Sequence, residues 1–190
     1  MMFKQMKKGF VFGSFIAGIF TTGTVLPVTL FAKDKIIGAV SSLDENTGIL
    51  TIIDNLVQVD ASNAKIQKKG VNNAILADIQ EDDIIKITGN DNDSGVIEAI
   101  SVKDPVKLKK NYDGKITGKT KKVNTSADTF TVMGQDVDAG NLPGVSMGGR
   151  TIPFDAMRPG VSVDVFVITK DSKLIAKKMV IRSESCNFCH

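Results

Sequence analysis

An internal repeat constrains the fold of this chain more than any other feature. Residues 35–103 and 114–182 carry the same pattern, shifted by about 80 positions. Short runs rich in Val, Ile and Thr alternate with clusters of Asn, Asp, Gly and Ser, and helical periodicity is nearly absent. Matched positions are apolar at alternate residues, as in strands with one buried face. The matched pairs are Gly38 with Gly118, Leu50 with Phe130, Ile52 with Val132, Val59 with Val137, Ala61 with Ala139, Ile79 with Met157, Ile85 with Val163 and Ile87 with Val165. The repeat predicts an all-β fold whose core is formed by these residues.

Each copy has about 70 residues, near the lower limit for a self-sufficient core. A small sheet removes its exposed edges best by closing into a barrel. We therefore expect two tandem small OB-like or SH3-like β-barrels, at 33–104 and 114–182, joined by a linker at 105–113. The expected strands are 35–43, 49–54, 56–60, 84–88 and 96–103 in the first copy, and 115–123, 129–133, the short run 137–139, 161–168 and 174–182 in the second. Residues 61–75 and the Gly-rich stretch after residue 139 are expected to be loops.

One short motif supports this reading of the body. Leu76, Ile79 and Asp83 form the pattern L-x-x-I-x-x-x-D before a β run, and the matching stretch of the second copy begins at Phe154. The pattern resembles an uncharacterised family of small β-barrel domains in exported bacterial proteins. The resemblance implies the fold and carries over no catalytic residue.

The N-terminal 32 residues have the order of a secretory signal. A basic segment with Lys4, Lys7 and Lys8 precedes the apolar run 9–20, and the helix breaker Pro27 follows. We expect cleavage after Ala32. The alternative is an uncleaved signal helix, because the uncharged stretch 9–32 is long enough to span a bilayer. Both readings place residues 33–190 outside the cytoplasm, in the periplasm or at the exterior of a bacterial cell envelope.

The charge balance excludes one class of function. The formal net charge of +3 comes from the three lysines of the N-terminal segment, and the rest of the chain has equal numbers of basic and acidic residues. A nucleic-acid binder would carry a strongly basic body. Six lysines near the linker (Lys107, Lys109, Lys110, Lys119, Lys121 and Lys122) are expected to form a solvated face or a docking patch for an acidic redox partner.

The last five residues of the sequence carry most of the functional argument. They read Cys186-Asn-Phe-Cys189-His190, and the chain has no other cysteine or histidine. This is the C-x-x-C-H pattern of c-type cytochromes. The resemblance implies that Cys186 and Cys189 form thioethers with the vinyl groups of one haem c, and that His190 is the proximal axial ligand of the iron. The tail 183–190 is thus the expected haem attachment segment.

The sequence does not assign the sixth ligand of the haem iron. No second histidine exists, and Met147 lies in the Gly-rich stretch 144–150, from which it could reach a haem. A partner could supply the ligand instead, or the iron could stay five-coordinate. The carboxylate of the C-terminal residue His190 favours Fe(III), so we expect a lowered reduction potential.

The sequence therefore predicts an exported monohaem cytochrome that transfers electrons and is not an enzyme, since no hydrolase motif or catalytic triad is present. Its expected partners are other cytochromes or redox proteins, the cytochrome maturation machinery and further copies of the chain in a homo-oligomer. A membrane is a partner only with an uncleaved signal. The alternative is a non-enzymatic envelope binding or structural module whose terminal Cys pair forms a disulfide or chelates a metal.

Overall fold

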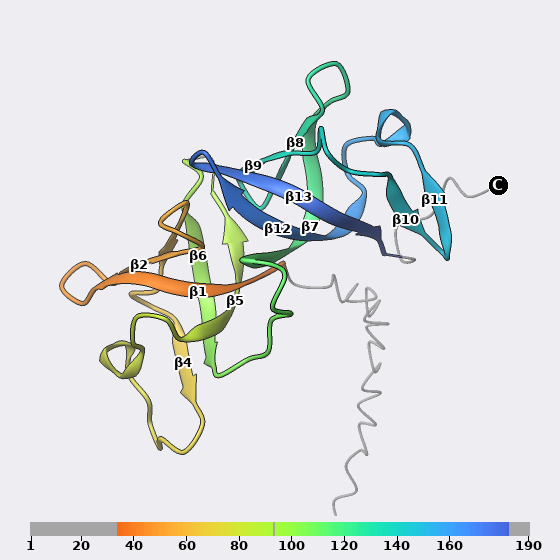
Figure 1. Cartoon of the computed structure of the whole chain (residues 1–190). Helices are drawn as coiled ribbons and strands as arrows, with labels where there is room; N and C mark the ends of the chain where they lie inside the picture. Colours follow the sequence, from red (N-terminus) through yellow and green to blue (C-terminus); the bar gives the residue numbers. More distant parts are fainter. Residues whose placement is uncertain (1–33, 93, 183–190) are drawn as a thin grey trace, which may run out of the picture. The chain divides into compact units, whose positions relative to one another are not determined.

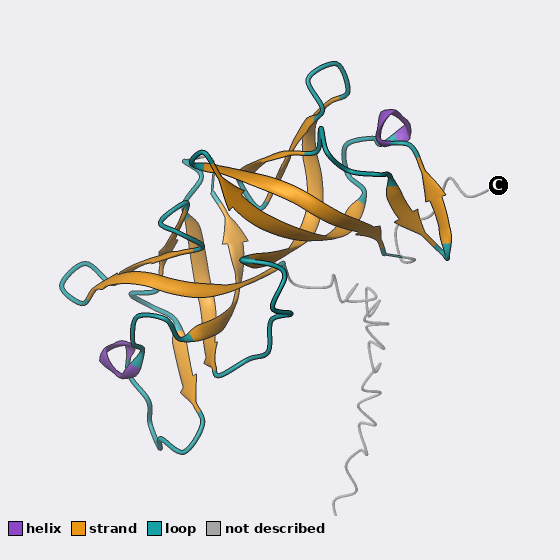
Figure 2. Ribbon diagram, in the orientation of Figure 1, coloured by secondary structure: helices purple, strands orange, loops and turns teal. Residues whose placement is uncertain are grey.

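The computed structural model describes residues 34–92 and 94–182, and this part of the chain is all-β (Figures 1 and 2). The strands are β1 (Lys35–Asp44), β2 (Ile49–Ile52), β3 (Val57–Asp60), β4 (Lys65–Lys68), β5 (Ile84–Asp91), β6 (Ile97–Asp104), β7 (Gly114–Asn124), β8 (Thr129–Val132), β9 (Gln135–Asp138), β10 (Val145–Met147), β11 (Arg150–Ile152), β12 (Ser162–Lys170) and β13 (Lys173–Ile181). Two single-turn 3-10 helices, η1 (Leu76–Asp78) and η2 (Phe154–Ala156), lie at corresponding places in the two halves.

The predicted core is confirmed. Each matched apolar residue of the repeat, the two glycines aside, is at most 3% exposed, from Leu50 and Phe130 to Ile87 and Val165. Their burial follows from the alternation, because every second side chain of a strand points to the same face. The core is built from Ile, Val, Leu and Met with few aromatic rings, and Phe130 packs against Phe154 at 5.9 Å between ring centroids.

Each half closes into a five-stranded ring. In the first half the neighbours run β1-β2-β3-β6-β5 and return to β1, with β3 and β6 parallel and the other neighbours antiparallel. In the second half they run β7-β8-β9-β13-β12 and return to β7, with β9 and β13 parallel. This topology is the OB-like one of the two expected alternatives.

Three strands were not expected from the sequence. β4 falls in the predicted polar loop 61–75, and β10 and β11 form a hairpin in the predicted Gly-rich loop. These short strands lie at the outer edges of the sheet and bury few side chains, so their sequences lack the apolar alternation of a core strand. The hairpin turns at Gly148 and Gly149, whose φ angles of 54° and 83° suit a tight two-residue turn.

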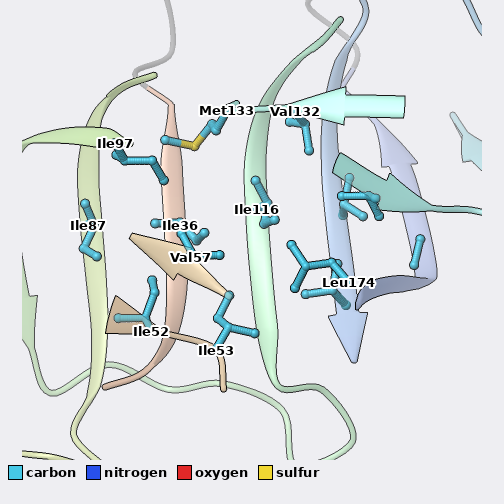
Figure 3. Close-up of a cluster of buried hydrophobic side chains, with 14 of the residues drawn as sticks. Ile36, Ile52, Ile53, Val57, Ile87, Ile97, Ile116, Val132, Met133 and Leu174 are labelled. Carbon is cyan, nitrogen blue, oxygen red and sulfur yellow. The ribbon is translucent and has the colours of Figure 1, made fainter. Parts of the chain in front are cut away.

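The two halves share one continuous sheet. The first residues of β1 and β7 pair antiparallel, and Ile36 stands opposite Ile116, its equivalent 80 positions later in the repeat. Two equivalent residues facing each other in an antiparallel pair define a local two-fold relation between the halves. Figure 3 shows Ile36 and Ile116 near the centre of the buried cluster, with Ile53 at one end and Met133 at the other. The segment 105–113 also bonds to the body, through Val106 N–H to the Ile84 carbonyl and Asp113 N–H to the Val167 carbonyl.

Close packing at this junction gives a first prediction. A Cβ atom at position 38 would stand 2.4 Å from Cγ1 of Ile53. Ile53 is buried, β-branched and held at a φ of 54°, so its side chain has little freedom to move. We expect Gly38→Ala to lower the free energy of unfolding by about 3 kcal/mol, measured by chemical denaturation.

The repeat supplies the matched control. At Gly118 the nearest atom to an added Cβ is Cγ of Met133, at 3.1 Å. An unbranched methionine adapts more easily than isoleucine, so Gly118→Ala is expected to cost about 1 kcal/mol. Equal losses from the two substitutions would contradict the proposed role of Ile53.

Candidate functional site

The predicted haem-binding residues Cys186, Cys189 and His190 lie outside the described residues, as does the predicted signal at 1–32. The structure therefore describes only Met147 among the predicted site residues. No helix within residues 34–92 and 94–182 is long and apolar enough to cross a membrane. The same residues contain no group of three or more Asp, Glu, His or Cys side chains arranged to hold a metal ion.

Met147 is the last residue of a strand, whereas the sequence indicated a flexible loop. It ends β10, pairs with Arg150 across the β10–β11 hairpin, and pairs in parallel with Ile181 at the end of β13. Its side chain is partly buried against the edge of the core. The backbone pairings on both sides hold this residue in place, so a large swing of its backbone is not available.

The four methionines after residue 32 differ in burial. Met133, Met157 and Met179 are at most 2% exposed, and all three are core residues of the second half. Met147 is only partly buried and lies beside the strand that leads directly into the tail 183–190. The chemistry of its thioether suits a haem iron. Of these four methionines, Met147 is the one that is not fully buried.

A charged cluster joins β4 to the first barrel. Nζ of Lys68 lies 2.9 Å from a carboxylate oxygen of Asp83 and 3.1 Å from one of Asp104, and donates to the Asp78 carbonyl at 2.7 Å. Asp104 is only 4% exposed, so its charge needs this cation. Burial alone would raise the pKa of Asp83, but hydrogen bonds from the Gln80 N–H and Lys68 hold that pKa below its usual value. The cluster is structural, because every group in it is satisfied.

Removing the cation gives a second prediction. Lys68→Met leaves Asp104 and Asp83 side by side and is expected to cost about 2 kcal/mol of unfolding free energy at neutral pH. A depressed carboxyl pKa stabilises the fold above the unfolded pKa of about 3.9, and this stabilisation is lost as the pH falls through the lower folded pKa. The cost of the substitution should therefore shrink in acid. Urea denaturation of both proteins across this pH range measures it.

The control for this prediction is the exposed pair Lys121–Asp91, 2.6 Å apart with the lysine side chain 55% exposed. Lys121→Met is expected to cost less than about 1 kcal/mol, because solvent screens an exposed pair. A cost for Lys68→Met that does not change with pH would contradict the role of Asp83.

The lysines near the linker come from two parts of the fold, the segment 105–113 and β7. Lys119 and Lys121 lie seven or fewer residues beyond Gly114 along β7, whereas Lys107, Lys109 and Lys110 precede its start. Strand geometry puts about 23 Å between Gly114 and Lys121. Lys121 also pairs with Asp91. The pKa of the neighbouring Asp34 is raised, mainly by burial and next by the Asp91 carboxylate. The positive charges of Lys119, Lys121 and Arg182 act in the opposite direction and reduce this shift. The docking patch for an acidic redox partner stays a prediction, and within it Lys121 is already paired with a carboxylate.

The predicted turns are hairpins held by their own side chains. Asp44 accepts hydrogen bonds from the N–H groups of Asn46 and Thr47, and the side chain of Asn92 accepts from Ser94 N–H and Val96 N–H. Both are Asx-type turns. Residues 45–48 thus turn the chain from β1 into β2, and residues 92 and 94–96 lie between β5 and β6.

One feature was missed from the sequence: a groove of about 620 Å³ beside β4. Its lining includes Lys65, Lys69 and Lys103, together with Val71. The available signal was the density of lysines in 65–69, which lacks the apolar alternation used to find strands. Comparison of the chain with models of protein families, with curated proteins and with solved structures gave no significant match.

Proposed function

We propose that this protein is an exported monohaem c-type cytochrome, which carries electrons through a haem c bound covalently by Cys186 and Cys189, with His190 as the proximal iron ligand. The observation that carries the proposal is the motif itself, formed by the only two cysteines and the only histidine of the chain. The haem would supply reversible Fe(III)/Fe(II) chemistry. The partners are other cytochromes or redox proteins, in the periplasm or outside the cell.

The β body supports this proposal as a scaffold. β13 ends at Ile181 beside Met147, and Cys186 follows Ile181 by five residues. A chain of that length spans at most about 17 Å. Two thiols for attachment to the vinyl groups, with an imidazole and a thioether as axial ligands, are the groups that a Met/His c-type haem uses.

The test is the intact mass and the pyridine haemochrome spectrum of the protein exported by a host with cytochrome maturation machinery. The proposal requires a mass gain of one haem, and a haem absorption that persists after denaturation. A mass equal to the processed chain less two hydrogens would mean a terminal disulfide and would overturn the proposal. The protein would then be the alternative: a non-enzymatic binding or structural module of the envelope, for which the duplicated barrel provides surface.

A third prediction concerns Met147 in this cytochrome. If its thioether ligates the iron, Met147→Leu removes the charge-transfer band between methionine sulfur and ferric haem and lowers the reduction potential, because a Met ligand raises it. The stability change should stay below about 1.5 kcal/mol, because the swap nearly conserves volume. The matched control is Met157→Leu, a buried methionine, which should leave the spectrum unchanged. An unchanged spectrum for Met147→Leu would assign the sixth position to another group.

A further inference from the structure

The groove beside β4 lies along an open edge of the sheet. β4 pairs in parallel with β6, and it pairs with no other strand of the part that the structure describes. Lys69 N–H bonds to the Asp104 carbonyl on the β6 side. Backbone groups alternate in direction along a strand, so Ile66 and Lys68 direct their N–H and carbonyl groups away from β6. The Lys68 carbonyl accepts from the Val71 N–H, and the other three groups face outward. Figure 1 shows β4 at one end of the body and β11, the other end of the sheet order, at the opposite end.

The second half of the chain shows which kind of strand pairs with such an edge. β10 begins 80 positions after β4 and runs parallel to β13 as β4 runs parallel to β6. Its outer edge is covered by β11, which pairs antiparallel with it from Val145 opposite Ile152 to Met147 opposite Arg150. The first half has no strand at this place among its described residues. The internal comparison therefore identifies the outer edge of β4 as a position for one further antiparallel strand.

The side chains of the groove define the chemistry of that strand. Lys65, Lys69 and Lys103 line the groove, and none of these three has a carboxylate partner among the described residues. Lys68 is neutralised beneath them by Asp83 and Asp104. The groove thus presents unpaired positive charge next to the outward-facing Lys68 N–H and the outward-facing backbone groups of Ile66, which suits an acidic segment in extended conformation.

The adjoining loop adds apolar surface. Val71 in the groove is 40% exposed, and Ile75, which follows the groove residue Ala74, is 62% exposed. Large exposed aliphatic side chains near an edge strand offer contacts to apolar residues of a bound segment. A second copy of the chain is a poor occupant, because two β4 edges would bring lysines against lysines.

We propose that the edge of β4 binds an extended acidic segment of a partner protein, which adds antiparallel to β4 as β11 adds to β10 and pairs its carboxylates with Lys65, Lys69 and Lys103. The backbone supplies affinity, and the lysines select an acidic sequence. The proposal does not depend on haem, and it applies equally to the cytochrome and to a binding module.

The test is selection of peptides from a random decapeptide library on the full exported chain. The expected result is enrichment of sequences that alternate Asp or Glu with apolar residues. Binding of the enriched peptide should fall by about tenfold or more, near 1.4 kcal/mol, for the variant Lys65→Glu/Lys103→Glu. The matched control Lys107→Glu/Lys109→Glu makes the same charge change outside the groove and should retain binding.

A backbone control separates strand addition from simple charge attraction. The enriched peptide with alternate backbone nitrogens methylated keeps its charges and loses its ladder donors, so it should bind about tenfold more weakly or worse. Four outcomes would overturn the proposal: no enrichment over the Lys65→Glu/Lys103→Glu variant, enrichment without acidic residues, equal loss in the Lys107→Glu/Lys109→Glu control, or equal binding of the methylated peptide. Circular dichroism of each variant confirms its fold.

Discussion

Replacing Cys186 and Cys189 together with alanine is expected to remove covalent haem completely while leaving the β body folded. Without a thiol, neither vinyl group of a haem can form a thioether, so the mass gain of one haem and the denaturation-resistant absorption should both disappear. Neither cysteine lies in the described body, whose core consists of other residues. Intact mass and the haemochrome spectrum measure the loss of haem, and circular dichroism measures the fold of the β body.

Single substitutions separate the roles of Cys186, Cys189 and His190. Cys186→Ala and Cys189→Ala each leave one thiol, so any haem retained should carry one unreacted vinyl group, and its haemochrome band should shift to longer wavelength. His190→Ala keeps both thiols and tests ligation separately from attachment. Covalent haem in the double variant would show that the attachment residues are misassigned. Loss of the β signal would mean that the tail is needed for folding.

The second large effect concerns the two barrels, which are expected not to fold as separate monomers. A fragment of residues 33–104 loses the four-residue pairing of β1 with β7 and exposes Ile36. Further contacts across the junction are lost: Gln135 donates to the Gly95 carbonyl at 2.7 Å, and the Thr169 hydroxyl donates to Asp54. A unit of about 70 residues has only a few kcal/mol of stability to lose.

The two-fold relation at Ile36 and Ile116 predicts how the fragments behave. In the full chain β1 pairs with β7, its equivalent in the repeat, so in a separated fragment the same edge could pair with a second copy of that fragment. We therefore expect residues 33–104 and 112–182 each to be unfolded or dimeric. An equimolar mixture of the two fragments should restore the native sheet. Light scattering and thermal melting of each fragment and of the mixture measure this. The control is the full chain cut once between residues 105 and 113, which should stay folded. A monomeric fragment that melts as cooperatively as the full chain would contradict the prediction.

The core was readable from the sequence because burial in a strand leaves a period of two. Leu50, Ile52, Ile85 and Ile87 are fully buried where the alternation and the repeat predicted them. β4 and the β10–β11 hairpin were missed because edge strands bury little apolar surface, so their sequences do not carry this period. Met147 was assigned to a loop for the same reason: it belongs to a hairpin in which Val145 alone of the six strand residues is fully buried.

The candidate site likewise combines a motif that is local in sequence with features that depend on the tertiary structure. The motif Cys186 to His190 is local in sequence, and its proposed chemistry needs only the spacing of its own residues. The position of Met147 beside Ile181 and the lysine groove along β4 each depend on residues brought together by pairing of distant strands.

Local sequence thus specified the strands of the two barrels, the turns between them and the haem motif, because each depends on side-chain type at short spacing. The closing of each ring through a parallel pair, the joining of the rings through β1 and β7, and the open edge at β4 came only from the fold. The physical reason is that strand pairing is carried by backbone hydrogen bonds, which every residue except proline can make and which therefore leave little trace in the identity of the residues that pair.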